Sequence, residues 1–133
     1  MPAAKPARVL IAILGIDQHE VGAIAIAHIL RDAGMEVVYA GRFQLPPAIV
    51  QMAVEEDVDV IGLSCHSWEY LYFLPEIMAL LEEAGAPLPI VVGGSIITPE
   101  DEVTLAAQGV RAAFGPGASP EHIVSTLRAI VSE

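Results

Sequence analysis

A short polar segment after the first apolar run of the chain carries the residues best suited to chemistry. It reads Gly15-Ile-Asp-Gln-His-Glu-Val-Gly22, and it places Asp17, His19 and Gly22 at the spacing Asp-x-His-x-x-Gly. A neutral histidine can present one ring nitrogen to a metal, while its other nitrogen usually donates a hydrogen bond to a carboxylate. The motif therefore indicates a metal-binding His19 oriented by Asp17, or alternatively an Asp17 that caps the next helix.

The elements that must position this motif are predicted by an alternation of apolar runs and amphipathic stretches. The apolar runs are continuous and rich in Val and Ile, as in parallel strands that are covered on both faces. Proline or Ser-Pro marks several helix starts, and glycine marks several helix ends. The predicted strands span residues 9–14, 36–39, 58–64, 90–92 and 112–114, and the predicted helices span residues 21–32, 46–56, 70–84, 99–108 and 119–131.

This alternation predicts one α/β domain over residues 1–133, with residues 1–7 frayed. The commonest solution for five parallel strands is the flavodoxin-like (Rossmann-like) order 2-1-3-4-5, with helices on both faces and right-handed crossovers. Ligands bind such sheets at the carboxyl ends of the strands, where the strand order reverses. That point lies between the first and third strands, so residues 15–22 and 64–69 form the predicted site.

Small residues recur at the carboxyl ends of the predicted strands. Gly22 falls at the start of the first helix, Ser64 ends the third strand, and Gly93-Gly94 follows the fourth. Glycine at these places either makes a turn or leaves room for a bulky group beside the sheet. The Ser64 hydroxyl could bond a ligand or cap a turn. Each residue also has a structural explanation, so the residues alone leave both interpretations open.

The composition excludes several classes of partner. The formal net charge is −11, and no Lys or Arg occurs between Phe43 and Val110, so the chain lacks the basic footprint of a nucleic-acid-binding protein. No apolar run approaches the roughly 20 residues of a membrane span. Cys65 is the single cysteine, which is typical of a reducing compartment. We therefore expect a cytoplasmic protein that binds neither nucleic acid nor membrane.

Taken together, these motifs resemble the cobalamin-binding domain of coenzyme-dependent acyl-CoA mutases and methionine synthase. The family pattern is Asp-x-His-x-x-Gly, then Ser-x-Leu, then Gly-Gly, and the order and approximate spacing match here. Phe43-Gln-Leu-Pro-Pro47 and Phe114-Gly-Pro-Gly117 are also similar to stretches in the small subunits of acyl-CoA mutases. The resemblance covers nearly the whole chain.

The resemblance implies a role for each matching residue. His19 would be the lower axial ligand of cobalt in adenosylcobalamin, replacing the cofactor's own dimethylbenzimidazole, and Asp17 would hydrogen-bond the far nitrogen of His19. The displaced nucleotide tail would insert beside the sheet. The implied cofactor-binding residues are Asp17, Gln18, His19, Glu20, Gly22, Ser64, His66, Gly93 and Gly94.

His66 departs from the family pattern, because it stands where the family has the leucine of Ser-x-Leu. It could bond the cofactor or a partner subunit, or face solvent. Four of the seven aromatic residues lie close by, at Trp68, Tyr70, Tyr72 and Phe73. They cannot all point inward from one helix face, so at least one is expected at the rim of the site.

Two other users of this fold are excluded by the residues present. A phosphoryl-accepting receiver domain needs an aspartate at the end of the third strand and a lysine after the fifth, and neither is found. A flavodoxin or a Walker-type nucleotide-binding protein needs a phosphate-binding loop after the first strand, and the residues there do not match one.

Two cobalamin-dependent functions remain. One is the small subunit of an acyl-CoA mutase of the methylmalonyl-CoA or 2-hydroxyisobutyryl-CoA kind. It would work with a larger acyl-CoA-binding barrel subunit and have no catalytic residue or turnover of its own. The other is a non-catalytic corrinoid carrier, delivery or sensor protein. Methyl carriers of the family usually carry a helical domain before the first strand. Here the first strand is predicted to start at about Arg8, which leaves no room for such a domain, so the mutase subunit is favoured.

Overall fold

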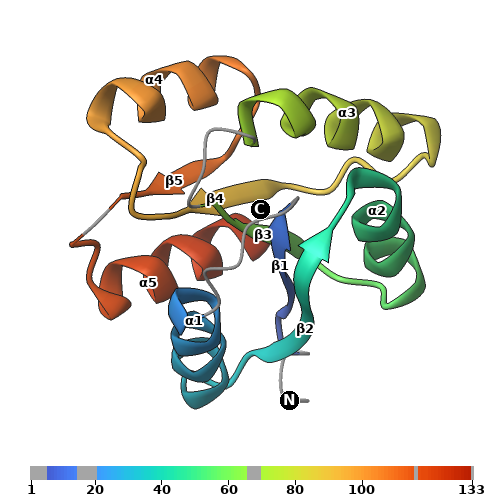
Figure 1. Cartoon of the computed structure of the whole chain (residues 1–133). Helices are drawn as coiled ribbons and strands as arrows, with labels where there is room; N and C mark the ends of the chain where they lie inside the picture. The colour runs from blue at the N-terminus through green and yellow to red at the C-terminus, as the bar shows by residue number, and fades with distance from the viewer. Residues whose placement is uncertain (1–5, 15–20, 66–69, 116, 133) are drawn as a thin grey trace.

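A parallel five-stranded sheet in the order β2-β1-β3-β4-β5 forms the centre of the molecule (Figure 1), which confirms the predicted flavodoxin-like topology. The computed structural model describes residues 6–14, 21–65, 70–115 and 117–132. The elements are β1 (Arg8–Leu14), α1 (Val21–Asp32), β2 (Glu36–Gln44), α2 (Pro46–Glu55), β3 (Val60–Ser64), α3 (Tyr70–Glu83), β4 (Ile90–Gly93), α4 (Pro99–Ala107), β5 (Ala112–Phe114) and α5 (Pro120–Val131).

Helices cover both faces of the sheet, as predicted. One buried cluster joins the sheet to α2, α3 and α4 through residues such as Ile49, Leu74 and Leu105. The other joins it to α1 and α5 through residues such as Leu30 and Leu127. β1 and β3 lie at the centre and are almost wholly buried, because both of their faces are covered.

β2 differs from its predicted range, since it continues to Gln44 instead of ending at Tyr39. Its pairing with β1 is irregular beyond Ile11, where Ala12 pairs with Gly41 and Leu14 with Gln44. Gly41 has a φ of +83°, which glycine adopts readily, and the Gln44 side-chain amide donates to the carbonyls of Ala40 and Arg42 at 3.1 Å. This bulged extension lacks an apolar alternation, so the sequence pattern did not mark it as a strand.

Local capping fixes the starts of two helices close to their predicted positions. The Thr98 hydroxyl accepts a hydrogen bond from the Asp101 amide at 3.1 Å, and the Asp101 carboxylate accepts one from the Thr98 amide at 2.9 Å. This reciprocal capping box begins α4. At α5 the Ser119 hydroxyl accepts from the His122 amide at 3.1 Å, followed by Pro120 at the first helical position.

Among the described residues, no helix is both long enough and apolar enough to cross a membrane. The longest is α3, with 14 residues.

Candidate functional site

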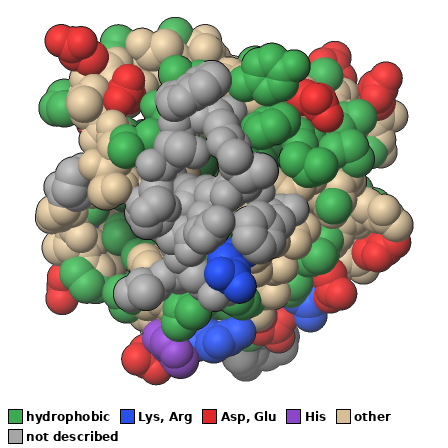
Figure 2. Space-filling view, in the orientation of Figure 1, with side chains coloured by type: hydrophobic (Ala, Val, Ile, Leu, Met, Phe, Trp, Pro, Cys, Tyr) green, Lys and Arg blue, Asp and Glu red, His purple; other side chains and the backbone are tan. Residues whose placement is uncertain are grey.

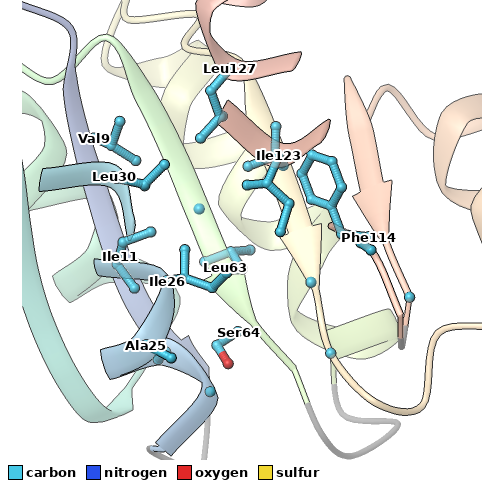
Figure 3. Close-up of a pocket in the computed structure, with 18 of the residues that line it drawn as sticks. Val9, Ile11, Ala25, Ile26, Leu30, Leu63, Ser64, Phe114, Ile123 and Leu127 are labelled. Carbon is cyan, nitrogen blue, oxygen red and sulfur yellow. The ribbon is translucent and has the colours of Figure 1, made fainter. Parts of the chain in front are cut away.

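An apolar cavity of about 360 Å³ lies between the sheet and the helices α1 and α5. Figure 3 shows its lining side chains converging from three directions, with Ala25, Ile26 and Leu30 on α1 and Ile123 and Leu127 on α5. The cavity begins near Ser64, at the carboxyl ends of the strands. It extends along the sheet toward Val9, at the start of β1.

The floor of the cavity is a trough of small residues between larger ones. In one row across the sheet, Gly62 on β3 pairs with Ile11 on β1 and Val91 on β4. In the next row toward the carboxyl ends, Ser64 pairs with Gly93, and Gly93 with Phe114. The two rows are two residues apart along each strand, so the side chains of both rows point to the same face of the sheet. The sheet itself is therefore hollowed where α1 and α5 cover it.

Gly93 and Gly94 have different roles, although both line the cavity. A Cβ on Gly93 would meet only Phe114, at 3.8 Å from its carbonyl oxygen and 3.9 Å from its Cβ, which is ordinary contact. A Cβ on Gly94 would overlap the carbonyl oxygen of Cys65 and lie 2.7 Å from its carbonyl carbon. Gly94 is therefore required by the packing of one backbone against another, whereas Gly93 is not.

The structure brings four of the predicted site residues to this cavity, namely Gly22, Ser64, Gly93 and Gly94. Five others lie outside the described residues, so their predicted roles stay predictions: Asp17, Gln18, His19, Glu20 and His66. The described residues include no group of three or more His, Cys, Asp or Glu side chains that could hold a metal. The expected metal ligand, His19, lies outside the described residues.

Several cavity residues were not predicted from the sequence. Gly62 is the most informative of them, because it interrupts the apolar run Val60-Ile-Gly-Leu-Ser64 in the middle of a buried strand. An isolated glycine inside a strand often marks a place where a ligand or another backbone approaches closely. That signal was present in the sequence. Ile26, Phe114 and Leu127 gave no comparable signal, because apolar residues in helices and strands usually belong to the core.

The described aromatic residues after the third strand differ in burial, so they do not all point inward, as predicted. Tyr70 is buried with 3% of its surface exposed, Phe73 packs partly against the core, and Tyr72 is 73% exposed at the start of α3. Trp68 lies outside the described residues. Burial raises the pKa of the Tyr70 hydroxyl, and the Asp101 carboxylate and Cys65 thiol raise it further. Tyr70 therefore belongs to the buried cluster on the α2, α3 and α4 side of the sheet.

Both histidines among the described residues, His28 and His122, are exposed. His28 lies on the exposed side of α1. His122 lies in the first turn of α5, with its ring edge-on to Phe114 at a centroid distance of 5.7 Å.

The size and lining of the cavity suit a small, mostly apolar ring system. Its volume is at the lower end of the roughly 300–1,000 Å³ typical of small-molecule sites, so it can hold an aromatic base rather than a whole corrin ring. Ser64 and Ser95 supply the only polar side chains among its described lining residues. Apolar walls with few polar groups suit a largely hydrocarbon ring system.

Comparison with known proteins agrees with this geometry. Residues 7–124 match the model of the B12 binding domain family. The chain is 44% identical over 126 residues to the pivalyl-CoA mutase small subunit of Xanthobacter autotrophicus, covering 95% of this chain and 84% of that protein. It is 39% identical over 127 residues to the 2-hydroxyisobutanoyl-CoA mutase small subunit of Aquincola tertiaricarbonis, covering 96% and 93%.

A solved structure of a cobalamin-binding protein from Desulfitobacterium hafniense has the same fold, with a TM-score of 0.79 and 20% identity over 95% of this chain and 60% of that one. The chain therefore belongs to the B12 binding domain family. Within that family, it belongs with the small subunits of acyl-CoA mutases. This confirms the family resemblance inferred from the motifs.

Proposed function

We propose that the chain is the adenosylcobalamin-binding small subunit of an acyl-CoA carbon-skeleton mutase. The observation that carries this proposal is the apolar cavity between the sheet, α1 and α5, which opens at Ser64 beside the strand ends. The small-subunit relatives, which match over nearly their whole lengths, support the mutase assignment over a carrier or sensor.

In this proposal His19 would hold the cobalt through one ring nitrogen, and Asp17 would accept a hydrogen bond from the other. That bond would fix the tautomer of His19 and make the imidazole a better electron donor. Gly22, Ser64 and Gly93 would line the path of the displaced nucleotide tail, and Gln18, Glu20 and His66 would border the corrin ring. The arrangement of β1 and β3 supports these roles, because the two strands end side by side at the mouth of the cavity.

The work of this chain would be to bind, orient and shield the cofactor. When bound, adenosylcobalamin supplies the radical chemistry of a 1,2-rearrangement. Inserting the tail between α1 and α5 would exclude water from the cavity and hold the corrin ring at a fixed height above the strand ends. None of the residues of this chain is proposed to act on the acyl-CoA, so no turnover is expected from it alone.

The acyl-CoA would bind a larger barrel subunit that docks at the same edge. Supporting this, Leu45 at the start of α2 and Leu71 and Tyr72 at the start of α3 are exposed by 51%, 41% and 73%. Figure 2 shows hydrophobic side chains gathered over α3 and α2, with acidic side chains toward the periphery. Apolar side chains enriched in aromatics are typical of the core of an interface. The assembly is proposed to be cytoplasmic.

The experiment is to titrate the purified chain with adenosylcobalamin and record the absorption spectrum. We expect a base-off, histidine-ligated spectrum that is lost in His19→Ala, because the variant has no imidazole at position 19 to bind cobalt. His28→Ala is the matched control, since His28 is exposed on α1 and should leave the spectrum unchanged. An unchanged cobalt spectrum in His19→Ala would refute the ligand assignment.

Asp17→Asn tests the second half of the assignment. It should retain histidine ligation but weaken binding by about 10–100-fold, as is usual when the partner of a metal-ligating histidine is replaced. Wild-type affinity and an unaltered spectrum would instead show that Asp17 only caps α1.

A further inference from the structure

The middle of the central strand β3 lacks a side chain where it faces α1 and α5. On that face β3 presents Val60, Gly62 and Ser64, so Gly62 lies between a buried valine and the mouth of the cavity. Glycine weakens a strand interior, because it adds backbone entropy to the unfolded state and packs nothing. A glycine at this position therefore calls for a reason outside the stability of the sheet.

The space at Gly62 is bordered by side chains that can move. A Cβ there would lie 2.9 Å from the terminal Cδ1 of Ile11 and 3.7 Å from Cγ2 of Val91. The close contact is with the far end of a flexible side chain that itself faces the cavity. No backbone atom lies closer than the Leu10 carbonyl oxygen, at 3.5 Å. The fold therefore tolerates a side chain at position 62, unlike at position 94.

Among the described lining residues, the polar side chains lie at one end of the cavity. The hydroxyls of Ser64 and Ser95 follow or end strands β3 and β4, at the carboxyl edge of the sheet. The other lining side chains that the structure describes are aliphatic or aromatic, and none is charged. A group inserted as far as Gly62 therefore meets no side chain that can donate or accept a hydrogen bond.

We propose that this cavity selects the lower base of the corrinoid, with Gly62 setting the depth to which the base inserts. This inference rests on the proposed function. The cavity would accept a benzimidazole, whose edges are apolar, and would disfavour a purine. Adenine carries ring nitrogens and an amino group that would lose water on insertion. A buried polar group without a partner is costly, whereas the methyl edges of dimethylbenzimidazole gain by burial.

The test compares three corrinoids on the full chain by absorption titration. They are adenosylcobalamin, its analogue with adenine as lower base, and adenosylcobinamide, which has the same corrin ring but no nucleotide tail. We expect the adenine analogue to bind about 10-fold or more weakly than adenosylcobalamin, which corresponds to the loss of one buried hydrogen-bond partner.

The variant is Gly62→Val, which fills the trough with a residue suited to a strand. It should weaken adenosylcobalamin binding about 10-fold or more, as overpacking does, and leave adenosylcobinamide binding unchanged. The matched control is Ile61→Val, which alters the same strand on its opposite face, against α2 and α3. It should affect neither corrinoid, and thermal unfolding checks that both variants fold.

Each outcome decides the inference. Equal affinity for the two bases, or equal weakening of adenosylcobalamin and adenosylcobinamide in Gly62→Val, would overturn base selection and leave the proposed function standing. Failure of all three corrinoids to bind the wild-type chain would overturn both. Misfolding of Gly62→Val would show that the position serves packing, which also overturns the inference.

Discussion

Replacing the two adjacent glycines at the end of β4, Gly93 and Gly94, one at a time should give opposite results. Gly94→Ala places a methyl group on the carbonyl of Cys65, which cannot move without displacing the end of β3. Two hydrogen bonds tie this region together, from the Cys65 amide to the Gly93 carbonyl at 2.8 Å and from the Gly94 amide to the Phe114 carbonyl at 3.2 Å. Gly94→Ala should strain or break both.

The magnitude follows from these contacts. A buried backbone group that loses its partner costs about 1–3 kcal/mol, and forced overpacking costs a similar amount. We expect Gly94→Ala to lower the free energy of unfolding by about 2–6 kcal/mol, a large fraction of the roughly 5–15 kcal/mol of a typical domain. Gly93→Ala meets no such contact and should change it by less than about 1 kcal/mol.

The assay is urea unfolding followed by circular dichroism, with the wild type and both variants at equal concentration. Gly93→Ala should keep the wild-type midpoint but weaken adenosylcobalamin binding, because its methyl group enters the cavity. A Gly94→Ala variant as stable as the wild type would refute the packing argument. So would a Gly93→Ala variant that is as unstable as we expect Gly94→Ala to be.

Two further predictions concern the same edge of the sheet. Thr98→Ala removes the capping box of α4 and should lower the free energy of unfolding by about 1 kcal/mol, measured by urea unfolding, whereas Thr104→Ala in the body of the helix should change it less. Because the folded-state pKa of Tyr70 is raised above its ordinary value near 10, the folded chain retains that proton longer than the unfolded chain. Stability should therefore fall as pH rises above about 10, and Tyr70→Phe should reduce that fall; an identical pH profile in the variant would contradict the assignment.

The fold could be predicted because most elements carry redundant signals. The strand β1 is a continuous apolar run, and α4 and α5 begin with a capping residue followed by proline. β2 was predicted too short, because its second half is shaped by Gly41 and by the side-chain amide of Gln44 rather than by apolar alternation. Long-range pairing decides such a strand, and a local pattern does not contain that information.

The site could be predicted in part, since polar and glycine residues at strand ends stand out from an apolar background. Gly22, Ser64 and Gly93 were found in this way, and all three line the cavity. The distinction between Gly93 and Gly94 could not be predicted, because it depends on the position of the Cys65 carbonyl, which directly follows another strand, β3. Adjacent glycines look equivalent in a sequence, whereas a sheet turns successive residues to opposite faces.

The two faces of the sheet divide the tasks of stability and binding. Among the residues that the structure describes, the cluster against α2, α3 and α4 has 19 buried residues, and the cluster against α1 and α5 has 12 and borders the cavity. Tight packing on one face can hold the strand ends in place, while small residues on the other face leave room for a ligand. Gly62 belongs to the second face and Ile61, its neighbour, to the first. Substitutions at alternate positions of β3 should therefore have different effects. Those on the face of Ile61 should affect folding, and those on the face of Gly62 should affect which ligand the cavity accepts.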